Sequence, residues 1–453
     1  LPKGYGLRSY PDITHTVRCQ FPVIDWDRAY WLTLGRECIN PRPVAEKMIH
    51  NTFAPDTIGF LTYSDGIHDD VNKFVWSAMG WNPDQDVREM LTEYARALIR
   101  DDLAEEIADG ILALEKNWEG PLATNSSVDA TLNLWQDLES QANETAHHNW
   151  RFQHGLFRAY YDAYVRHRLI HEEELEREVM NLLMQAGIPD PVSDLPWSAR
   201  EMMFRAEAIL QQADIQRPKV AWREHIFEIA DRMMNTIGHQ TSVTRHAQLD
   251  YDRGTMLDTI DHPLNDRLWL EDEFVRIREL PTEEERTAAL HSLAMYASPV
   301  PGTSYDDLGD IGNQPHLVRQ MGWTMDPHLR YCLNGVHQDW GAYLDRKRLS
   351  QQDGIGCFPF WSPDWEVELR YVSLNRERQY RFRAGCVKGE TSEYALFADD
   401  HELKPMGPPK SLDIYEEYSV PASLTADGAL NIRWEVQQGN GIHITEAWLI
   451  PDR

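Results

Sequence analysis

The spacing of apolar residues changes along this chain, and the change constrains what the chain can fold into. From Asp84 onward, apolar side chains recur every three or four residues, as at Met90, Tyr94 and Leu98, which is the pattern of a helix with one buried face. After Trp365 the pattern becomes short apolar runs separated by turn residues, which is typical of an antiparallel β-sandwich. The sequence therefore predicts helices over about 84–297 and antiparallel strands from about 362.

The first part of the chain is organised differently. Two strand patterns, one over 13–17 and one over 57–63, flank a helical pattern over 44–53. A strand, a crossover that contains a helix and a second strand predict a βαβ unit, in which the two strands are parallel. Ligand chemistry collects at the carboxyl ends of such strands, so the polar residues that follow them are the candidate site.

The stretch 62–73 follows the second strand and is rich in carboxylates, with a His, an Asn and a Lys among them. Paired carboxylates can act as general acid and base, or as acid and nucleophile, in glycoside hydrolysis. Asp69 and Asp70 are adjacent and point to different sides, so Asp65 with Asp69 is the better catalytic pair. The side chains expected to bind substrate are Asp12, His15, Arg18, Tyr63, His68, Asp70, Asn72 and Lys73.

Other interpretations of these residues stay open. Asp residues are also typical of a solvated acidic turn that caps the next helix. Arg18 either binds a substrate carboxylate or pairs with Asp12 or Asp25 in a structural salt bridge. A metal held by the 65–70 cluster is a third interpretation, but the spacing matches no known ligand motif. The sequence therefore predicts no bound metal and no cofactor.

Composition excludes several classes of partner. The formal net charge of −29 repels phosphate backbones and anionic membrane surfaces, so nucleic acid is not expected as a partner. No run of about eighteen apolar residues is present, so no membrane span is expected. The five Cys contain no CxxC pair and form neither a zinc motif nor a small-protein disulfide framework. No GxSxG, P-loop or GxGxxG string occurs, which removes the support for serine-hydrolase and nucleotide-binding functions.

Several strings resemble the last barrel segments of large bacterial glycoside hydrolase-like proteins, similar to the (β/α)8 exo-glycosidases of the family 20 β-hexosaminidase and α-glucuronidase kind. They are Tyr10-Pro11-Asp12-Ile13-Thr14-His15, Gly35-Arg36-Glu37, Ile39-Asn40-Pro41-Arg42-Pro43, Tyr63-Ser64-Asp65-Gly66 and His68-Asp69-Asp70-Val71-Asn72-Lys73. Gly80-Trp81-Asn82-Pro83-Asp84 is similar to the passage in which such enzymes leave the barrel for a helical domain. Tyr305-Asp306-Asp307-Leu308-Gly309 and Glu446-Ala447-Trp448-Leu449-Ile450 resemble their distal parts.

The resemblance implies a multidomain α+β fold. It comprises the last strand–helix units of a (β/α)8 TIM-type barrel over 1–83, an α-helical domain over 84–304, an irregular connecting segment over 305–361 and a β-sandwich over 362–453. The principal acid/base carboxylates of such families come from middle barrel strands, which this chain lacks. We therefore expect a missing N-terminal region or a second chain to complete the barrel. A homo-oligomer stays open.

The function expected from these observations is that of an exo-acting glycoside hydrolase on a polysaccharide or oligosaccharide, outside the cell or in the periplasm. The chain would supply the end of the active-site barrel, and its partner would be the carbohydrate substrate. Two alternatives remain. One is a carbohydrate-binding or assembly protein without catalysis, and the other is a metal-dependent hydrolase that uses the 65–70 acidic cluster.

Overall fold

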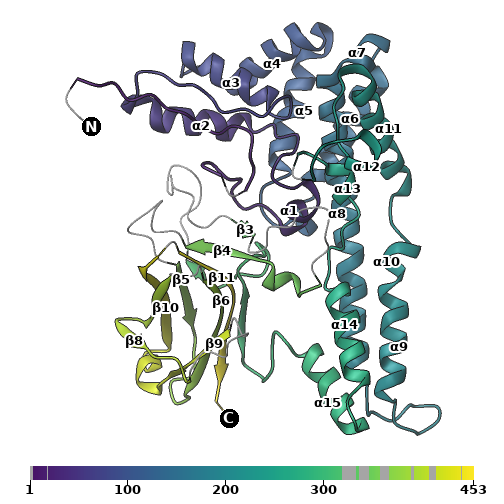
Figure 1. Cartoon of the computed structure of the whole chain (residues 1–453), viewed down its shortest axis with the longest axis vertical. Coiled ribbons are helices and arrows are strands. Elements are labelled where there is room, and N and C mark those ends of the chain that lie inside the picture. Colours follow the sequence, from purple (N-terminus) through teal and green to yellow (C-terminus); the bar gives the residue numbers. More distant parts are fainter. Residues whose placement is uncertain are drawn as a thin grey trace.

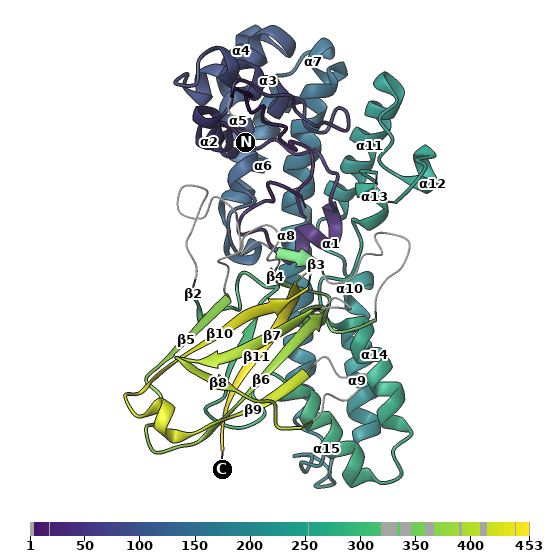
Figure 2. The ribbon, with the colours of Figure 1, turned by 60° about the vertical axis from the view of Figure 1, so that its left-hand side comes forward.

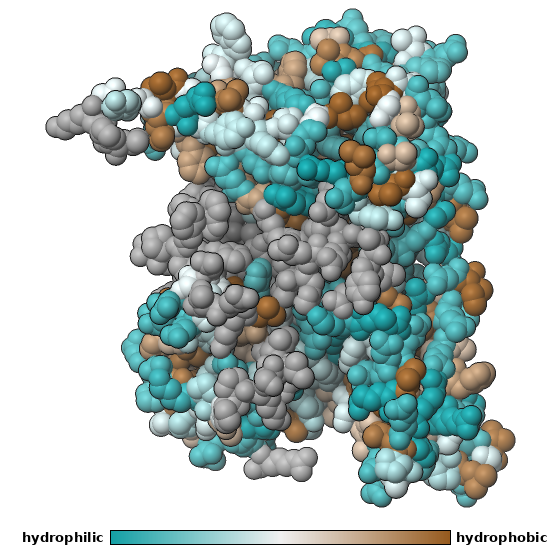
Figure 3. All heavy atoms as spheres, viewed as in Figure 1, coloured by the Kyte–Doolittle hydropathy of each residue, from teal (hydrophilic) through white to brown (hydrophobic). Residues whose placement is uncertain are grey.

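The computed structural model describes residues 4–17, 19–251, 253–318, 333–335, 346–357, 367–388, 392–407, 415–439 and 441–452. The fold is α+β, with helices in the first two thirds of the chain and two antiparallel sheets in the last third. In Figure 1 the sheets stand beside the lower half of the helical part, and α1 lies between the two. Hydrophilic residues cover most of the described surface in the view of Figure 3.

The helices are α1 Arg28–Leu34, α2 Pro43–Phe53, α3 Asp70–Trp81, α4 Val87–Leu98, α5 Ala104–Lys116, α6 Ser127–Gln141, α7 Glu144–His148, α8 Trp150–Leu183, α9 Ala199–Leu210, α10 Gln212–Ile215, α11 Val220–Ile237, α12 Val243–His246, α13 Met256–Thr259, α14 Arg267–Arg278 and α15 Glu283–Ala294. Short 3-10 helices are η1 Ala54–Asp56, η2 Asp101–Leu103, η3 Leu122–Thr124, η4 Leu349–Gln351 and η5 Ala422–Thr425. In the described residues no helix is long and apolar enough to span a membrane.

The strands are β1 Ser304–Asp307, β2 Leu317–Val318, β3 Leu333–Gly335, β4 Asp353–Cys357, β5 Val367–Val372, β6 Tyr380–Lys388, β7 Glu393–Ala398, β8 His401–Leu403, β9 Tyr415–Val420, β10 Ala429–Gln438 and β11 Ile442–Pro451. One sheet has the order β3-β4-β11-β6-β9, with β1 also on β11, and the other has the order β2-β5-β10-β7-β8. Figure 2 shows the sheets beside the lower helices. Alternate side chains of β5 are buried, as expected for a sheet with one face in a core.

The segment 305–361, expected to be irregular, contributes β2–β4 and most of β1 to the two sheets. These strands are short, and Gly354 and Gly356 lie in β4, so the segment carries no apolar alternation that the sequence could reveal. They form because β11 and β5 would otherwise leave edge N–H and C=O groups unpaired. Asp306 of this segment is fully buried and accepts hydrogen bonds from the hydroxyl of Tyr371 and the backbone N–H of His316.

Near the N-terminus, two segments run parallel, as the predicted βαβ unit requires, but the first is 7–13 and not the predicted 13–17. The chain turns after Asp12, whose carboxylate accepts the N–H groups of Thr14 and His15. Isolated bridges between the two segments join Ser9 to Phe60 and Asp12 to Tyr63. The N–H of Tyr63 donates to the carbonyl of Pro11 at 2.7 Å, and other bonds of this kind continue the ladder over 7–13 and 58–63. This parallel pair, as we call residues 7–13 and 58–63, defines no barrel by itself. The named sheets are antiparallel throughout.

The long helix α8 is the axis of the helical part in Figures 1 and 2, and it contacts α6, α9 and α11. Its aromatic residues Phe152, Phe157 and Tyr161 are fully buried. Gly155 of α8 faces the Trp135 indole so closely that an added Cβ would lie 1.9 Å from Cη2 of that ring. The absence of a side chain at this position therefore allows α6 and α8 to pack.

A buried ion pair fastens the first helix to the sheet. Arg28 of α1 donates to both carboxylate oxygens of Asp307 and both of Asp353, at distances of 2.5–2.9 Å. Burial raises the pKa of both carboxyl groups, and the guanidinium of Arg28 opposes that rise. The bidentate geometry on each side holds α1, β1 and β4 in a fixed relation.

Candidate functional site

Two turns bring polar residues together where the parallel pair ends. The Oδ1 atom of Asp12 accepts the N–H groups of Thr14 at 3.1 Å and His15 at 3.3 Å, which is a local turn that Asp favours. The turn folds the His15 ring back, so its Nδ1 lies 2.8 Å from Asp12 Oδ2. On the second segment, the N–H of Asp65 donates to Thr14 Oγ1 at 3.0 Å. The two turns are therefore bonded to each other.

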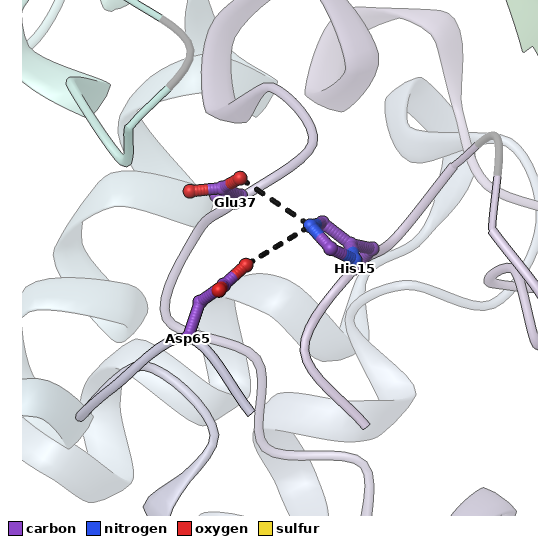
Figure 4. Close-up of side chains that lie close together, drawn as sticks. All are labelled: His15, Glu37 and Asp65. Atoms are coloured by element: carbon purple, nitrogen blue, oxygen red, sulfur yellow. Dashed lines mark hydrogen bonds and ion pairs between the residues drawn. The ribbon is translucent and has the colours of Figure 1, made fainter. Parts of the chain in front are cut away.

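His15 is the centre of the candidate site and is only 4% exposed. Its Nε2 lies 3.3 Å from Oε1 of Glu37 and 3.2 Å from Oδ2 of Asp65, as Figure 4 shows. Burial lowers the pKa of His15, but its hydrogen bonds to Asp12 and Glu37 outweigh burial and raise the pKa to about 9. His15 is therefore a cation at neutral pH and lies among three carboxylates.

The two carboxylates on Nε2 have further partners. Arg253 Nη1 donates to Glu37 Oε1 at 3.0 Å, and although burial raises the pKa of Glu37, His15 and Arg253 bring it below its usual value. The hydroxyl of Tyr63 donates to Asp65 Oδ1 at 2.9 Å. The Tyr63 ring also stacks on His15, with centroids 5.6 Å apart. The side chain of Asp65 keeps 19% of its surface exposed, so a ligand in solution can reach it.

Asp69 has a different environment from Asp65. It is fully buried, and its carboxylate accepts hydrogen bonds from the hydroxyls of Thr14 and Ser64. Lys73 Nζ lies 2.9 Å from Asp69 Oδ1 and also donates to the carbonyl of Gly66. These contacts hold the 64–69 loop on the end of the first segment, and they occupy both carboxylate oxygens of Asp69.

Asn72 joins three stretches of backbone and is also fully buried. Its Nδ2 donates to the carbonyls of Ile13 at 3.0 Å and Asn40 at 2.7 Å. Its Oδ1 accepts the N–H of Arg42 at 2.9 Å. Both ends of the amide are therefore used by the fold, and the residue holds the loop that carries Glu37 against the parallel pair.

His68 points toward the helical part, where it meets His239, and His239 in turn meets His154. The Nε2 of His68 lies 2.9 Å from Nε2 of His239, and the Nδ1 of His239 lies 3.4 Å from Nε2 of His154. Burial lowers the pKa of all three rings, so this histidine chain is neutral at pH 7. Gly254 lies against both the His68 ring and the backbone carbonyl of Glu37, because a Cβ added to it would lie 2.7 Å from the ring and 2.8 Å from the carbonyl oxygen. His68 is therefore close to the backbone of Glu37.

Asp70 begins α3 and is bonded to the helices as well. It accepts the hydroxyl of Tyr94 at 2.8 Å and Nε of Arg151 at 2.8 Å. With His68 it lines a small cavity whose wall is completed by residues of α4, α5 and α8. Asp65, Asp69 and Asp70 therefore face three separate environments and do not converge on one ion.

The structure divides the predicted site residues into groups. It brings together Asp12, His15, Tyr63 and Asp65. It places Asp69, Asn72 and Lys73 in the contacts that hold the loops, and His68 and Asp70 against the helices. Arg18 lies outside the described residues. Sequence reasoning selected neither Glu37 nor Arg253 for the site, although Glu37 belongs to the string Gly35-Arg36-Glu37 on which the resemblance rests.

Comparisons with known proteins add little. No family model matches the sequence, and no curated protein matches it. Among solved structures, the chain is similar to a family GH115 4-O-methyl-α-glucuronidase with specificity for decorated arabinogalactans, at 11% identity and a TM-score of 0.21. The match covers 99% of this chain and 52% of that one, so this chain spans about half the length of that structure. A likeness at this level carries no argument about fold or activity.

Proposed function

We propose that this protein is a glycoside hydrolase that acts on the end of an oligosaccharide or polysaccharide. The observation that carries the proposal is the convergence of Glu37, Asp65 and His15, whose polar atoms lie within 4.8 Å of one another. Carboxylates accept hydrogen bonds from the hydroxyls of a sugar. Carboxylates that converge in this way suit a polyhydroxylated ligand.

Asp65 is the carboxylate that we assign to contact with substrate. Its side chain is partly exposed, and Tyr63 fixes one of its oxygens, so the other is aimed into the cluster. Asp69, predicted to act with it, is assigned a positioning role instead, since its oxygens are engaged by Thr14, Ser64 and Lys73. The principal catalytic acid is assigned to no residue of this chain.

The end of a (β/α)8 barrel is the fold that we propose around this cluster. The parallel pair, with α2 between its segments and α3 after them, supports this assignment. Exposed apolar side chains also lie on or beside the pair, with Tyr5 76%, Ile58 81% and Leu61 51% exposed. Further strands, from a second chain or from residues outside this sequence, would cover such groups and satisfy the edges.

A panel of 4-nitrophenyl glycosides tests the activity, with α-glucuronides and β-N-acetylhexosaminides included. We expect release of nitrophenolate from at least one glycoside, and less release by an Asp65→Asn variant of the same stability. Titration calorimetry with the corresponding free oligosaccharides measures binding separately from turnover. Binding without cleavage of any glycoside would overturn the hydrolase and identify a carbohydrate-binding protein, and neither binding nor cleavage would overturn the carbohydrate assignment.

A further inference from the structure

We infer that His15, Glu37 and Asp65 form a binding site for one divalent transition-metal ion, Zn²⁺ or Mn²⁺. This inference goes beyond the proposed function, because it rests on the ligand geometry and not on the nature of the substrate. The inferred site also differs from the metal site that the sequence offered at 65–70, because Asp65 is its only ligand from that cluster.

The distances between the ligand atoms fit a single ion. His15 Nε2 lies 3.3 Å from Glu37 Oε1 and 3.2 Å from Asp65 Oδ2, and all three atoms lie within 4.8 Å of one another. Zinc binds imidazole nitrogen and carboxylate oxygen at about 2.0–2.2 Å, which places neighbouring ligands of one ion roughly 3.0–3.5 Å apart. Small side-chain adjustments are therefore enough, and the backbone need not move.

The surroundings of the ligands match those of metal-binding residues. A metal-binding His usually gives its second ring nitrogen to a carboxylate, which fixes the ring and its tautomer. Asp12 Oδ2 takes this place, 2.8 Å from His15 Nδ1. Tyr63 donates to Oδ1 of Asp65 and leaves Oδ2 for the ion. The imidazole at the centre of the cluster is therefore oriented by Asp12 and only 4% exposed.

The charges at the site are those that an ion would satisfy. Asp12, Glu37 and Asp65 bring three carboxylates together, and His15 and Arg253 are the cations in contact with them. The Arg253 side chain is 55% exposed, so it can leave Glu37 for solvent at small cost. The ion binds the neutral imidazole, so binding releases the Nε2 proton of His15 to solvent, and the ion supplies positive charge in place of that proton and of Arg253.

The ligand set selects the class of ion. Imidazole with carboxylates suits Zn²⁺ and Mn²⁺, whereas Ca²⁺ takes six to eight oxygens and Mg²⁺ keeps most of its waters. Three protein ligands leave at least one coordination position open. Because Asp65 is partly exposed, this position faces solvent, where a water or a substrate oxygen can bind.

Titration calorimetry of the metal-free protein with ZnCl₂, and separately with MnCl₂, tests the site without any sugar. We expect one ion per chain, and we expect Glu37→Gln and Asp65→Asn each to weaken binding about tenfold or more. The control is Glu139→Gln. Glu139 and Glu228 contact His225 through opposite ring nitrogens, so these three cannot hold one ion, and this variant should bind like the wild type.

Each outcome decides the inference. No saturable binding, or binding that both site variants leave unchanged, would overturn it, since the ion would then sit elsewhere on the acidic surface. If Glu37→Gln does not fold, judged by circular dichroism, the partly exposed Asp65→Asn decides alone. Glycoside cleavage without metal binding would leave the proposed function intact, and metal binding without cleavage would leave this site intact.

Discussion

The Nε2 atom of His15 lies 3.2 Å from Oδ2 of Asp65, although the two residues belong to different turns of the parallel pair. The hydroxyl of Thr14 in the first turn accepts the N–H of Asp65 in the second turn at 3.0 Å. The contact therefore results from the pairing of the two segments, and any change that shifts one segment against the other disrupts the candidate site.

Replacing Asp65 by Asn should lower activity and leave stability nearly unchanged. A hydrogen bond from a charged group is worth about 1.5–3 kcal/mol, so kcat/KM for a cleaved glycoside should fall roughly 10- to 100-fold. Steady-state kinetics and thermal unfolding measure the two effects. Asp56→Asn is the control, because Asp56 is an exposed acid of η1. Full activity of Asp65→Asn would show that Asp65 does not contact the substrate.

Asp69→Ala should instead destabilise the fold. Asp69 is fully buried, and its loss leaves the hydroxyls of Thr14 and Ser64 and the ammonium of Lys73 without their acceptor. We expect the free energy of unfolding to drop by about 1–3 kcal/mol, measured by urea denaturation. An unchanged free energy combined with lost turnover would return Asp69 to the catalytic role predicted from the sequence.

The parallel pair could be predicted because a strand, a helix-containing crossover and a second strand leave few other arrangements. The sequence could not show which of the neighbouring Asp65, Asp69 and Asp70 faces the cluster. That depends on the backbone path of the loop, which the buried hydroxyl of Thr14 sets from the other segment. The spacing of residues within one stretch contains no information about such a contact.

The rest of the candidate site comes from distant parts of the chain. Glu37 lies in the crossover, where Asn72 fixes the following backbone. Arg253 lies between α12 and α13, in a stretch without any motif, and reaches the site only because the helical part folds over it. The helical and antiparallel regions could be predicted from the spacing of their apolar residues. Strands β1–β4 could not, because strands this short show no regular spacing.

Glu46 should make stability depend on pH. It is fully buried beside Arg42 and accepts the indole N–H of Trp76 at 2.7 Å, and burial raises its pKa to about 7. The folded state therefore holds this proton more tightly than the unfolded chain, whose Glu has a pKa near 4.3. The stabilisation is complete below about pH 4 and is lost as pH rises to about 7.

Urea denaturation of the wild type and Glu46→Gln between about pH 4 and pH 8 measures this contribution. The wild type should lose stability relative to the variant as pH rises from about 4.3 to 7, and the difference should be flat above that range. A difference that stays constant over the whole range would show that Glu46 has the same pKa in both states.

Arg28→Ala should lower the free energy of unfolding by about 3–5 kcal/mol, because it leaves Asp307 and Asp353 buried without a counter-charge. Burial raises the pKa of both carboxyl groups, so they can take up protons in acid. The loss should therefore be larger at pH 8 than at pH 5, measured by urea denaturation. The control Arg88→Ala breaks an exposed pair with Asp109 and should leave stability nearly unchanged. A loss of stability that does not change with pH would contradict the raised pKa of the two carboxyl groups.

Gly155→Ala should destabilise the helical part although Ala favours helices. The new Cβ would lie 1.9 Å from the Trp135 ring, and overpacking of this kind costs about 1–3 kcal/mol. Thermal unfolding checks the effect, with Gly407→Ala as control, because nothing lies within 4 Å of a Cβ at Gly407. Equal stability of both variants would mean that α6 moves freely against α8.

The bonds of Arg28 to Asp307 and Asp353 should also hold the protein together after one proteolytic cut in the chain. A protease can reach the chain between α8 and α9, where Ile188, Val192 and Leu195 are 51%, 92% and 68% exposed. One cut there separates two polypeptides, yet α1 on the first remains clamped to β1 and β4 on the second. The nicked protein therefore elutes as a single particle on a sizing column and splits into two bands only in denaturant.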